Sequence, residues 1–324
     1  MKRILLTGAS GFVGANLTRS LIAHGHEVHL LVRPEFARWR LEGVLDQVQL
    51  HDESLADPEG LSRRMVAVQP EWVFHLAVYG AYSQQDDLAR MVRTNIVGTM
   101  NLVNACLEAG VEVMVNTGSS SEYGFKAHPP SETDWIDPNS HYAVTKASAT
   151  LFCRFTARKH HVRIPTLRLY SAYGPYEDPG RLIPALIMRG LRKELPPLVS
   201  PDIARDYVYI DDVVQAYLRA ASLESGDPGV VYNVGTGIQT RLTELVGIAR
   251  RSMAIEAEPV WGTMPNRSWD TSTWVADNAR IRTEIGWEPQ FDLESGLRAT
   301  LQWFAAHPEM LSYYEKNSST TSHQ

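Results

Sequence analysis

The spacing of hydrophobic positions divides the chain into two kinds of segment. Through the first half, short apolar runs alternate with longer segments that carry apolar residues every three or four positions. The runs are typical of buried strands, and the longer segments are typical of amphipathic helices. The pattern predicts strands at 2–7, 27–32, 48–50, 72–77, 111–117 and 164–169, and helices at 12–24, 58–68, 86–109 and 141–161.

This regular alternation predicts an α/β fold built on a doubly wound parallel sheet. Beyond Tyr170, proline and glycine crowd the chain, and short helices such as 182–192 lie among loops. This change indicates a smaller C-terminal lid domain. Segments near 205–235 are expected to return from the lid to the first domain. We expect a first domain over 1–170, the lid over 171–316 and a disordered polar tail over 317–324.

Three glycines lie between the first predicted strand and the first predicted helix. Gly8, Gly11 and Gly14 are three residues apart in this strand–turn–helix context. In such a turn the backbone N–H groups can approach a pyrophosphate, and the helix dipole adds positive potential. A glycine triplet alone is a weak signal, so it indicates only where a dinucleotide site would begin.

Composition and charge exclude several classes of function. The 324 residues carry a net charge of −6 with a pI of about 6.0, so no basic field favours nucleic acid or an anionic membrane. Metal-ligand spacing, a membrane-spanning apolar run and a signal-peptide pattern are all missing. Cys106 and Cys153 fit buried free thiols in a reducing compartment. We therefore expect a cytoplasmic protein without a bound metal.

A tyrosine and a lysine stand four residues apart in the predicted helix 141–161. The spacing places Tyr142 and Lys146 on one face, one turn apart. A nearby ammonium favours the phenolate, so we expect the lysine to lower the pKa of the tyrosine. Such a tyrosine can exchange a proton with a carbonyl or alcohol oxygen during hydride transfer. The alternative is a packed tyrosine beside a surface lysine.

Three serines follow the predicted strand 111–117. Ser119, Ser120 and Ser121 come where a parallel strand ends and faces the ligand cleft. A hydroxyl there can hydrogen-bond a reacting carbonyl. The alternative is a serine-rich turn.

Together these features resemble the extended short-chain dehydrogenase/reductases, in particular their nucleotide-sugar epimerase, dehydratase and reductase group. The resemblance reaches to about residue 305 and rests on the ordered segments 7–14, 75–77, 95–99, 119–124, 142–146, 168–175, 205–212 and 232–237. It implies a Rossmann-type NAD(P)-binding domain, a nucleotide-diphosphate sugar as substrate, and a homodimer formed through the helices 86–109 and 141–161. The apolar stripes of these helices would also fit burial against the sheet.

The resemblance also implies roles for individual residues. It assigns catalysis to Ser119, Tyr142 and Lys146. It assigns cofactor binding to Gly8, Ser10, Gly11, Phe12, Val13, Gly14, Leu76, Ala77, Asn95, Tyr142 and Lys146, with Asp52 at the adenine. It assigns substrate binding to Ser120, Ser121, Arg205 and Arg267. For the two arginines, the alternative is a solvated side chain on the surface.

Departures from the family pattern bear on the reaction. Ser120 and Ser121 replace the Asp and Glu that dehydratases use as acid and base, which argues against a 4,6-dehydratase. Arg33 stands where NAD-using members carry an Asp that holds the ribose, so the charge favours NADP(H), with NAD(H) still possible. Ser171 and Trp269 replace a usual Asn and Gly, which leaves the sugar and the base open.

These observations favour an NADPH-dependent reductase of a nucleotide-linked 4-keto-6-deoxy sugar. Tyr142 would protonate the developing alkoxide, Ser119 would polarise the carbonyl, and Lys146 would hold the nicotinamide ribose. The first alternative is an NAD-dependent nucleotide-sugar 4-epimerase, which uses the same three residues. A reductase of another carbonyl compound and a non-catalytic redox sensor are further alternatives.

Overall fold

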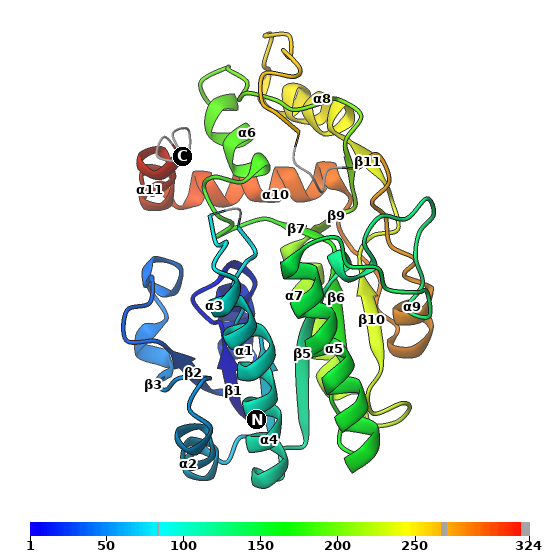
Figure 1. Ribbon diagram of the computed structural model, residues 1–324. Coiled ribbons are helices and arrows are strands. Elements are labelled where there is room, and N and C mark those ends of the chain that lie inside the picture. The colour runs from blue at the N-terminus through cyan, green and yellow to red at the C-terminus, as the bar shows by residue number, and fades with distance from the viewer. Residues whose placement is uncertain (83, 267–270, 319–324) are drawn as a thin grey trace.

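A seven-stranded parallel sheet forms the centre of the larger part of the molecule (Figure 1). The computed structural model describes residues 1–82, 84–266 and 271–318. The strand order is β10-β6-β5-β4-β1-β2-β3, which confirms the expected Rossmann-type, doubly wound sheet. Its strands are β1 (Arg3–Thr7), β2 (Glu27–Val32), β3 (Gln49–Asp52), β4 (Trp72–His75), β5 (Val113–Ser119), β6 (Thr166–Leu169) and β10 (Val231–Val234).

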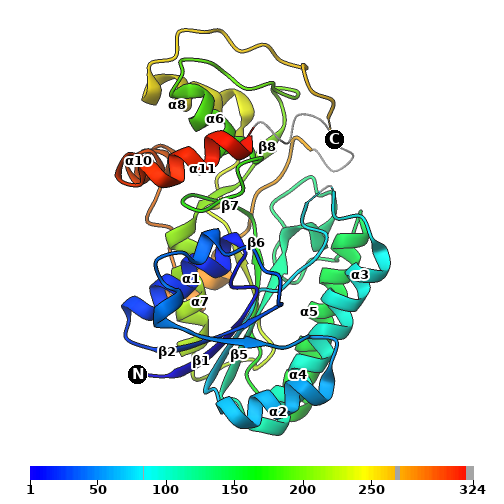
Figure 2. The same cartoon turned by 90° about the vertical axis from the view of Figure 1, so that its left-hand side faces the viewer.

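Helices cover both faces of this sheet (Figure 2). One face is packed by α1 (Phe12–Ala23) and α7 (Ile210–Ser222), and the other by α2 (Pro58–Val68), α4 (Gly98–Ala109) and α5 (His141–His160). The central strand β1 is apolar without interruption because both faces are covered, and Ile4, Leu5 and Leu6 are fully buried. Cys106 and Cys153 are buried free thiols in the core, as expected.

Local capping signals explain where several helices begin and end. The Asp57 side chain accepts the Gly60 N–H ahead of α2, and the Ser140 side chain accepts the Ala143 N–H ahead of α5. Gly110 ends α4 in the left-handed conformation that a glycine adopts without strain. The single helix predicted over 86–109 consists instead of α3 (Leu88–Val92), a π-helical turn η3 (Arg93–Val97) and α4. Such π-turns are frequent at functional sites.

A smaller, mostly helical part lies above the carboxyl ends of the strands (Figures 1 and 2). Its helices are α6 (Leu182–Gly190), α8 (Leu242–Met253), α10 (Leu293–Ala306) and α11 (Pro308–Ser318), and α9 (Ala279–Ile285) packs beside β10. Its strands form the pairs β7 (Ser171–Tyr173) with β9 (Tyr207–Tyr209) and β8 (Ala204–Arg205) with β11 (Thr240–Arg241). We expected a disordered tail over 317–324, but its first two residues belong to α11, which reaches Ser318. Residues 319–324 lie outside the described residues.

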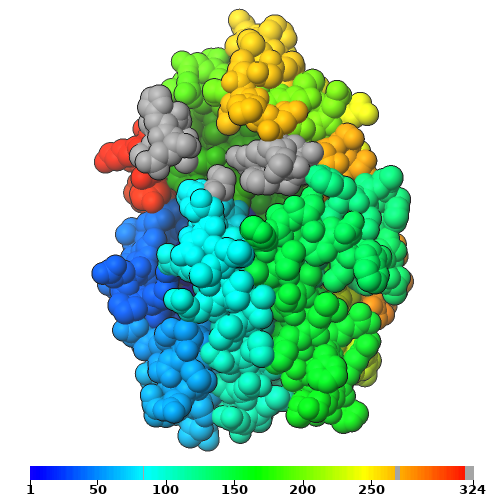
Figure 3. All heavy atoms as spheres, in the orientation of Figure 1, coloured from blue at the N-terminus to red at the C-terminus, as the bar shows by residue number. Residues whose placement is uncertain are grey.

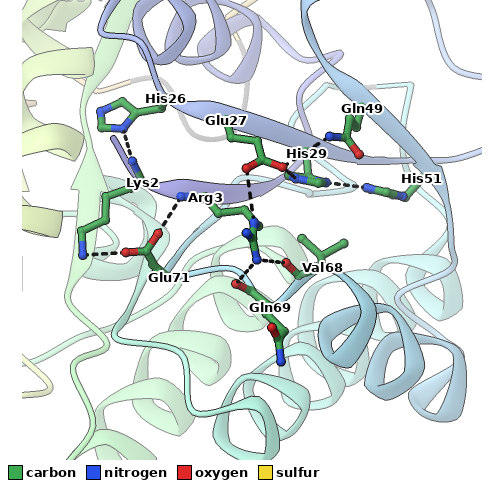
Figure 4. A network of polar contacts seen from close by, with 10 residues as sticks. All are labelled: Lys2, Arg3, His26, Glu27, His29, Gln49, His51, Val68, Gln69 and Glu71. Carbon is green, nitrogen blue, oxygen red and sulfur yellow. Dashed lines mark hydrogen bonds and ion pairs between the residues drawn. The ribbon is translucent and has the colours of Figure 1, made fainter.

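A polar network closes the opposite, amino-terminal end of the sheet (Figure 4). His29 on β2 contacts the Glu27 carboxylate at 3.0 Å and the His51 ring at 2.8 Å, and the Glu71 carboxylate accepts the Arg3 N–H. Burial and Arg64 lower the pKa of His51 to about 4. The network satisfies the polar groups at the strand ends. Within the described part of the chain, no three His, Cys, Asp or Glu side chains converge as metal ligands, and no helix is long and apolar enough to cross a membrane.

Candidate active site between the two parts

A cavity of about 1640 Å³ lies between the carboxyl ends of the strands and the smaller part. This volume exceeds the several hundred Å³ that one drug-sized ligand needs, so it has room for a dinucleotide and a second substrate. Its acidic lining residues are Glu53, Asp87 and Glu177. Its arginines are Arg33, Arg40, Arg90, Arg93, Arg181, Arg189, Arg192 and Arg205. This excess of guanidinium groups favours phosphate-bearing ligands although the whole chain is acidic.

The glycine turn forms one wall of the cavity. Gly8 has a φ of +75°, and a Cβ on it would collide with the Leu76 backbone. A Cβ on Gly14 would collide with the carbonyl oxygen of Gly8, so α1 can approach the turn only because that residue is glycine. Gly11 is the N-cap of α1, and it lines the cavity together with Phe12, Val13 and Gly14 of the first turn, whose N–H groups have no partner within the helix. The turn therefore fits a pyrophosphate, and the structure places the predicted cofactor contacts Ser10, Phe12, Val13, Leu76 and Ala77 in the cavity lining with it.

His75 orders the strand ends beside the glycine turn. Its Nδ1 lies 2.7 Å from the Thr7 hydroxyl and its Nε2 lies 2.9 Å from the Thr99 hydroxyl. Because the Thr99 hydroxyl donates its proton to the Asn95 carbonyl, Nε2 must carry the imidazole proton and Nδ1 must accept from Thr7. Burial lowers the pKa of His75 to about 3, so the ring stays neutral. Both ring nitrogens are used, which suits a structural role.

Asn95 connects the π-turn to the catalytic helix. Its side-chain amide donates to the Tyr79 carbonyl and to the Thr145 hydroxyl, and its amide oxygen accepts the Tyr79 N–H. The side chain is buried and is not part of the cavity lining. Asn95 was expected among the cofactor contacts; here it positions Tyr79, which does line the cavity, and Thr145 on α5.

Ser119 and Tyr142 meet at the cavity, at the ends of β5 and α5. The Ser119 side chain is close enough to the Tyr142 phenol to lower its pKa, and both residues line the cavity. Burial raises the pKa of Tyr142, and the nearby Ser119 side chain opposes this shift only in part. The phenol therefore carries its proton at neutral pH, which suits a general acid.

Lys146 does not tune this tyrosine as the spacing predicted. Its buried ammonium donates to the Thr117 carbonyl, and its own pKa is lowered by burial. Among the main influences on the pKa of Tyr142, the cation is Arg181 and not Lys146. The prediction of a lowered tyrosine pKa was wrong because desolvation of the phenol outweighs charges placed one helical turn away.

Glu122 lies beneath Ser119 and was not singled out from the sequence. It is fully buried; one carboxylate oxygen accepts the Ser119 N–H at 2.8 Å and the Thr150 hydroxyl at 2.9 Å, and the other accepts from Arg168 at 2.8 Å. The Ser-x-x-Glu spacing from 119 to 122 is a capping-box signature that could have revealed it. All of its contacts lie in the core and it does not line the cavity, so it cannot replace the carboxylates that a dehydratase needs.

The two residues predicted at the adenosine end differ in placement. Arg33 directly follows β2, is exposed and lines the cavity. Asp52 is exposed at the end of β3 and does not line the cavity, whereas Glu53 and Ser54 do. The position of the Asp52 side chain therefore does not support its assignment to the adenine.

The predicted substrate residues lie on both sides of the cavity. Ser120 and Ser121 line it from the turn after β5, and Arg205 on β8 lines it from the smaller part, with its guanidinium over the Trp274 ring at 5.5 Å. Ser171 lines it as well. Arg267 and Trp269 lie outside the described residues.

A second buried carboxylate, Glu177, lines the cavity from the loop between β7 and α6. Within the described part of the chain its Oε2 has no hydrogen-bond partner, and burial raises its pKa to about 8. Arg181, four residues on, donates to the Ala81 carbonyl at 2.9 Å across the cavity. Sequence reasoning missed both residues, since nothing in a proline- and glycine-rich loop indicates which charged side chain will be buried.

Comparison with known proteins agrees with this geometry. The family model described as "NAD dependent epimerase/dehydratase family" matches residues 4–235. The chain is 32% identical over 314 residues to the UDP-glucose 4-epimerase of Mycolicibacterium smegmatis, covering 93% of this chain and 98% of that protein. It is 30% identical over 321 residues to a dTDP-glucose 4,6-dehydratase of Streptomyces griseus, covering 94% of each.

Solved structures show the same fold with ligands. The UDP-glucose 4-epimerase of Thermotoga maritima with UDP-glucose has a TM-score of 0.84 at 30% identity, covering 94% of this chain and 99% of that chain. The Thermus thermophilus UDP-glucose 4-epimerase complex with NAD has a TM-score of 0.82 at 26% identity, with the same coverage of 94% and 99%. The chain therefore belongs to the NAD-dependent epimerase/dehydratase family, the extended short-chain dehydrogenase/reductase group that contains nucleotide-sugar epimerases and dehydratases.

Proposed function

We propose that the protein is an NADPH-dependent reductase of a nucleotide-linked 4-keto-6-deoxy sugar. The observation that carries this proposal is the neutral Tyr142 phenol, which lines the cavity together with Ser119. Reduction of a ketone requires a proton donor at the carbonyl oxygen, and a buried neutral phenol is such a donor at physiological pH. A dehydratase is disfavoured, because Ser120 and Ser121 replace the acid–base pair and Glu122 points into the core.

The residues present fit a dinucleotide. The turn at Gly8, Gly11 and Gly14 would hold the pyrophosphate. Lys146 remains our candidate for holding the nicotinamide ribose, although its ammonium donates to the Thr117 carbonyl and does not line the cavity. When bound, the nicotinamide supplies the hydride for carbon 4 of the sugar. Ser119 hydrogen-bonds the carbonyl oxygen, and Tyr142 gives that oxygen its proton as the alkoxide forms; solvent then reprotonates the phenolate. Arg205, with the other arginines of the cavity, would hold the diphosphate of the substrate.

The position of Arg33 supports NADPH over NADH. Its guanidinium is exposed at the end of β2 and lines the cavity, where a 2′-phosphate of the adenosine ribose would add two negative charges. NAD is bound by several structures of the same fold, so NADH is the second cofactor to examine.

An NAD-dependent nucleotide-sugar 4-epimerase is the second candidate. The identity to UDP-glucose 4-epimerases over nearly the full chain favours it. An epimerase first removes the hydroxyl proton and later returns it, so it needs Tyr142 as both base and acid.

One experiment separates the candidates. Purified protein is incubated with NADPH and a panel of UDP-, dTDP-, CDP- and GDP-linked 4-keto-6-deoxy sugars, and NADPH absorbance is followed. In parallel, UDP-glucose is incubated without added reductant and examined for UDP-galactose. NADPH oxidation with one sugar supports the reductase, and Tyr142→Phe should slow it at least about a hundredfold. No oxidation with any member of the panel overturns the reductase, and interconversion of the two hexoses would establish the epimerase.

We also propose that two copies associate through the face formed by α3, α4 and α5 (Figure 3). On α5, Leu151 is 52% and Phe155 is 64% exposed, and Val144 lies on the same stripe. Leu88, Val92, Val97 and Met100 are exposed on the neighbouring helices. A second copy would cover these apolar side chains. Light scattering should give a dimer for the unaltered protein and a monomer for Phe155→Glu combined with Leu151→Glu; a monomer in both cases contradicts the proposal.

A further inference from the structure

The loop between β7 and α6, residues 174–181, is joined to α1 by one side chain. Asn16 on α1 donates from its amide nitrogen to two carbonyls, that of Phe12 and that of Pro175, each at 3.0 Å. Phe12 belongs to the first turn of α1, directly after the glycine turn, and Pro175 belongs to the loop. Asn16 is not part of the cavity lining, so it acts between the two segments rather than on a ligand.

Arg40 forms a second connection beside the first. Its Nε donates to the Tyr176 carbonyl in the loop at 2.8 Å, and its Nη1 donates to the Ser10 carbonyl in the glycine turn at 3.3 Å. Its Nη2 lies 3.8 Å from the Asp178 carboxylate. The residue is only 7% exposed, so these contacts are shielded from water. A guanidinium can hold both carbonyls at once because its donors are spread over a planar fork.

The loop depends on this support, because part of its backbone is strained. Tyr176 has a φ of +68°, a left-handed conformation that a bulky residue rarely adopts. Its ring lies under the Arg19 guanidinium at 4.0 Å and packs against Trp303 at 4.8 Å, and the Glu177 carbonyl accepts from the buried Tyr314 hydroxyl. Such a conformation persists only where the surroundings over-determine it. Loss of one connection should therefore let the loop relax.

The connection through Asn16 responds to a ligand in the glycine turn. The peptide between Phe12 and Val13 has an N–H without a partner inside α1, at a residue that lines the cavity, and a carbonyl that accepts from Asn16. A pyrophosphate that accepts from this N–H polarises the peptide and so strengthens the hydrogen bond at its carbonyl. Binding in the turn therefore strengthens the connection that reaches Pro175.

The far end of the loop is part of the cavity wall. The cavity is lined here by Glu177, Pro179, Gly180 and Arg181, and Arg181 donates to the Ala81 carbonyl on the other side. The loop continues into α6 of the smaller part, which under the proposed function holds the nucleotide sugar. A second ligand binds more tightly to a wall that is already ordered, because its binding no longer has to supply the ordering free energy.

We propose that Asn16 and Arg40 couple the two halves of the site, so that a dinucleotide bound at the glycine turn orders the loop 174–181 and raises the affinity for the nucleotide sugar. For the identity of the second ligand, this inference rests on the proposed function. Both are positioning residues, because they act on the backbone of the turn and of the loop. The coupling is reciprocal, so the second ligand raises the affinity for the dinucleotide by the same factor.

Hydrogen exchange tests the coupling without turnover. Exchange of the backbone amides in 174–181 is measured in the free protein and with saturating NADP or, separately, NAD. In the unaltered protein we expect the dinucleotide to slow exchange of the loop about fivefold. Asn16→Leu removes the donor at similar size, and Arg40→Lys keeps the charge but lacks the fork that spans two carbonyls; each should abolish most of this protection. The exposed Arg63→Lys on α2 serves as the control and should keep it.

Titration calorimetry gives the second measurement. The affinities of UDP and dTDP are measured with and without NADP, and the ratio within each protein isolates the coupling from any general change in stability. We expect a ratio of about tenfold in the unaltered protein and in Arg63→Lys, and of about twofold or less in Asn16→Leu. If neither nucleoside diphosphate binds, the proposed substrate is wrong, and the exchange measurement still decides this inference.

Three results overturn the inference. The first is a loop that neither dinucleotide protects in the unaltered protein, and the second is protection that is unchanged in Asn16→Leu. The third is protection lost in Arg40→Lys alone, which would place the effect in the guanidinium at the cavity and not in the connection between the segments. If Arg40→Lys does not fold, Asn16→Leu decides.

Discussion

Two buried glutamates flank the site, and they differ in how their polar atoms are satisfied. Glu122 beneath Ser119 receives hydrogen bonds from a backbone N–H, a hydroxyl and a guanidinium, whereas Glu177 in the opposite wall keeps an oxygen that no described residue contacts by a hydrogen bond. The first group is paired within the core, and the second belongs to a buried residue of the cavity wall. The contrast indicates that the carboxylate on the sheet side strengthens the core, whereas the buried carboxyl group on the loop side costs stability when it is ionised.

The largest expected effect is on the sheet side. Glu122→Ala leaves the Arg168 guanidinium, 4% exposed in its side chain, without its carboxylate partner. We expect a loss of about 3–5 kcal/mol in the free energy of unfolding, measured by urea denaturation. Replacing both partners together, as Glu122→Leu with Arg168→Met, should recover much of this loss. A single-variant loss under about 1 kcal/mol would remove the distinction between the two glutamates.

On the loop side the expected change has the opposite sign. The pKa of Glu177 is about 8 in the folded protein, above the ordinary value of the unfolded chain, so the folded state binds the extra proton between these two pH values. Stability from this group is therefore fully present at low pH and is lost as the pH rises toward 8. Glu177→Gln should match the unaltered protein near pH 4 and exceed its stability at pH 8 by on the order of 3 kcal/mol. Equal thermal unfolding temperatures at pH 8 would contradict this expectation.

The third prediction concerns Tyr142, whose protonation state should appear in the pH dependence of the reaction rate. Its pKa is raised by burial, and the protonated phenol is the active form of a general acid. Rates of ketone reduction under saturating NADPH should stay level from about pH 6 to 9 and decline only above about pH 10. A rate that rises about tenfold per pH unit over the same range would mean that the phenolate is the active form.

The smallest effect is expected at the exposed rim. Arg33→Ala should raise the KM for NADPH about tenfold and leave the KM for NADH unchanged, because only NADPH carries the 2′-phosphate. Arg63→Ala, on the outer surface of α2 with 70% of its side chain exposed, is the matched control. Equal effects on both cofactors would place the 2′-phosphate elsewhere.

Much of the fold follows directly from local patterns. The continuous apolar run at residues 4–6 identified a strand buried on both faces, and the glycine triplet located the turn before α1. Ser119 and Tyr142 are brought together because parallel strands and the helices that follow them place their ends at one edge of the sheet. The order of residues along the chain was therefore sufficient to predict where these features lie in the fold.

Other features depend on contacts between distant segments. Lys146 has the spacing for tuning Tyr142, yet burial dominates the pKa of the phenol. Asp52 and Glu53 are neighbours in sequence, but only the geometry of the strand end decides which of them faces the cavity. Glu177 becomes a buried acid only because α1, α11 and Arg40 hold its loop from three sides.

By itself, the sequence determined the order of strands and helices, the glycine turn and the residues available for proton transfer, because these depend on local spacing and side-chain chemistry. Only the tertiary structure decided which charged groups lose their water and which of them find partners. Desolvation depends on every segment that packs around a group, and those segments are far apart along the chain.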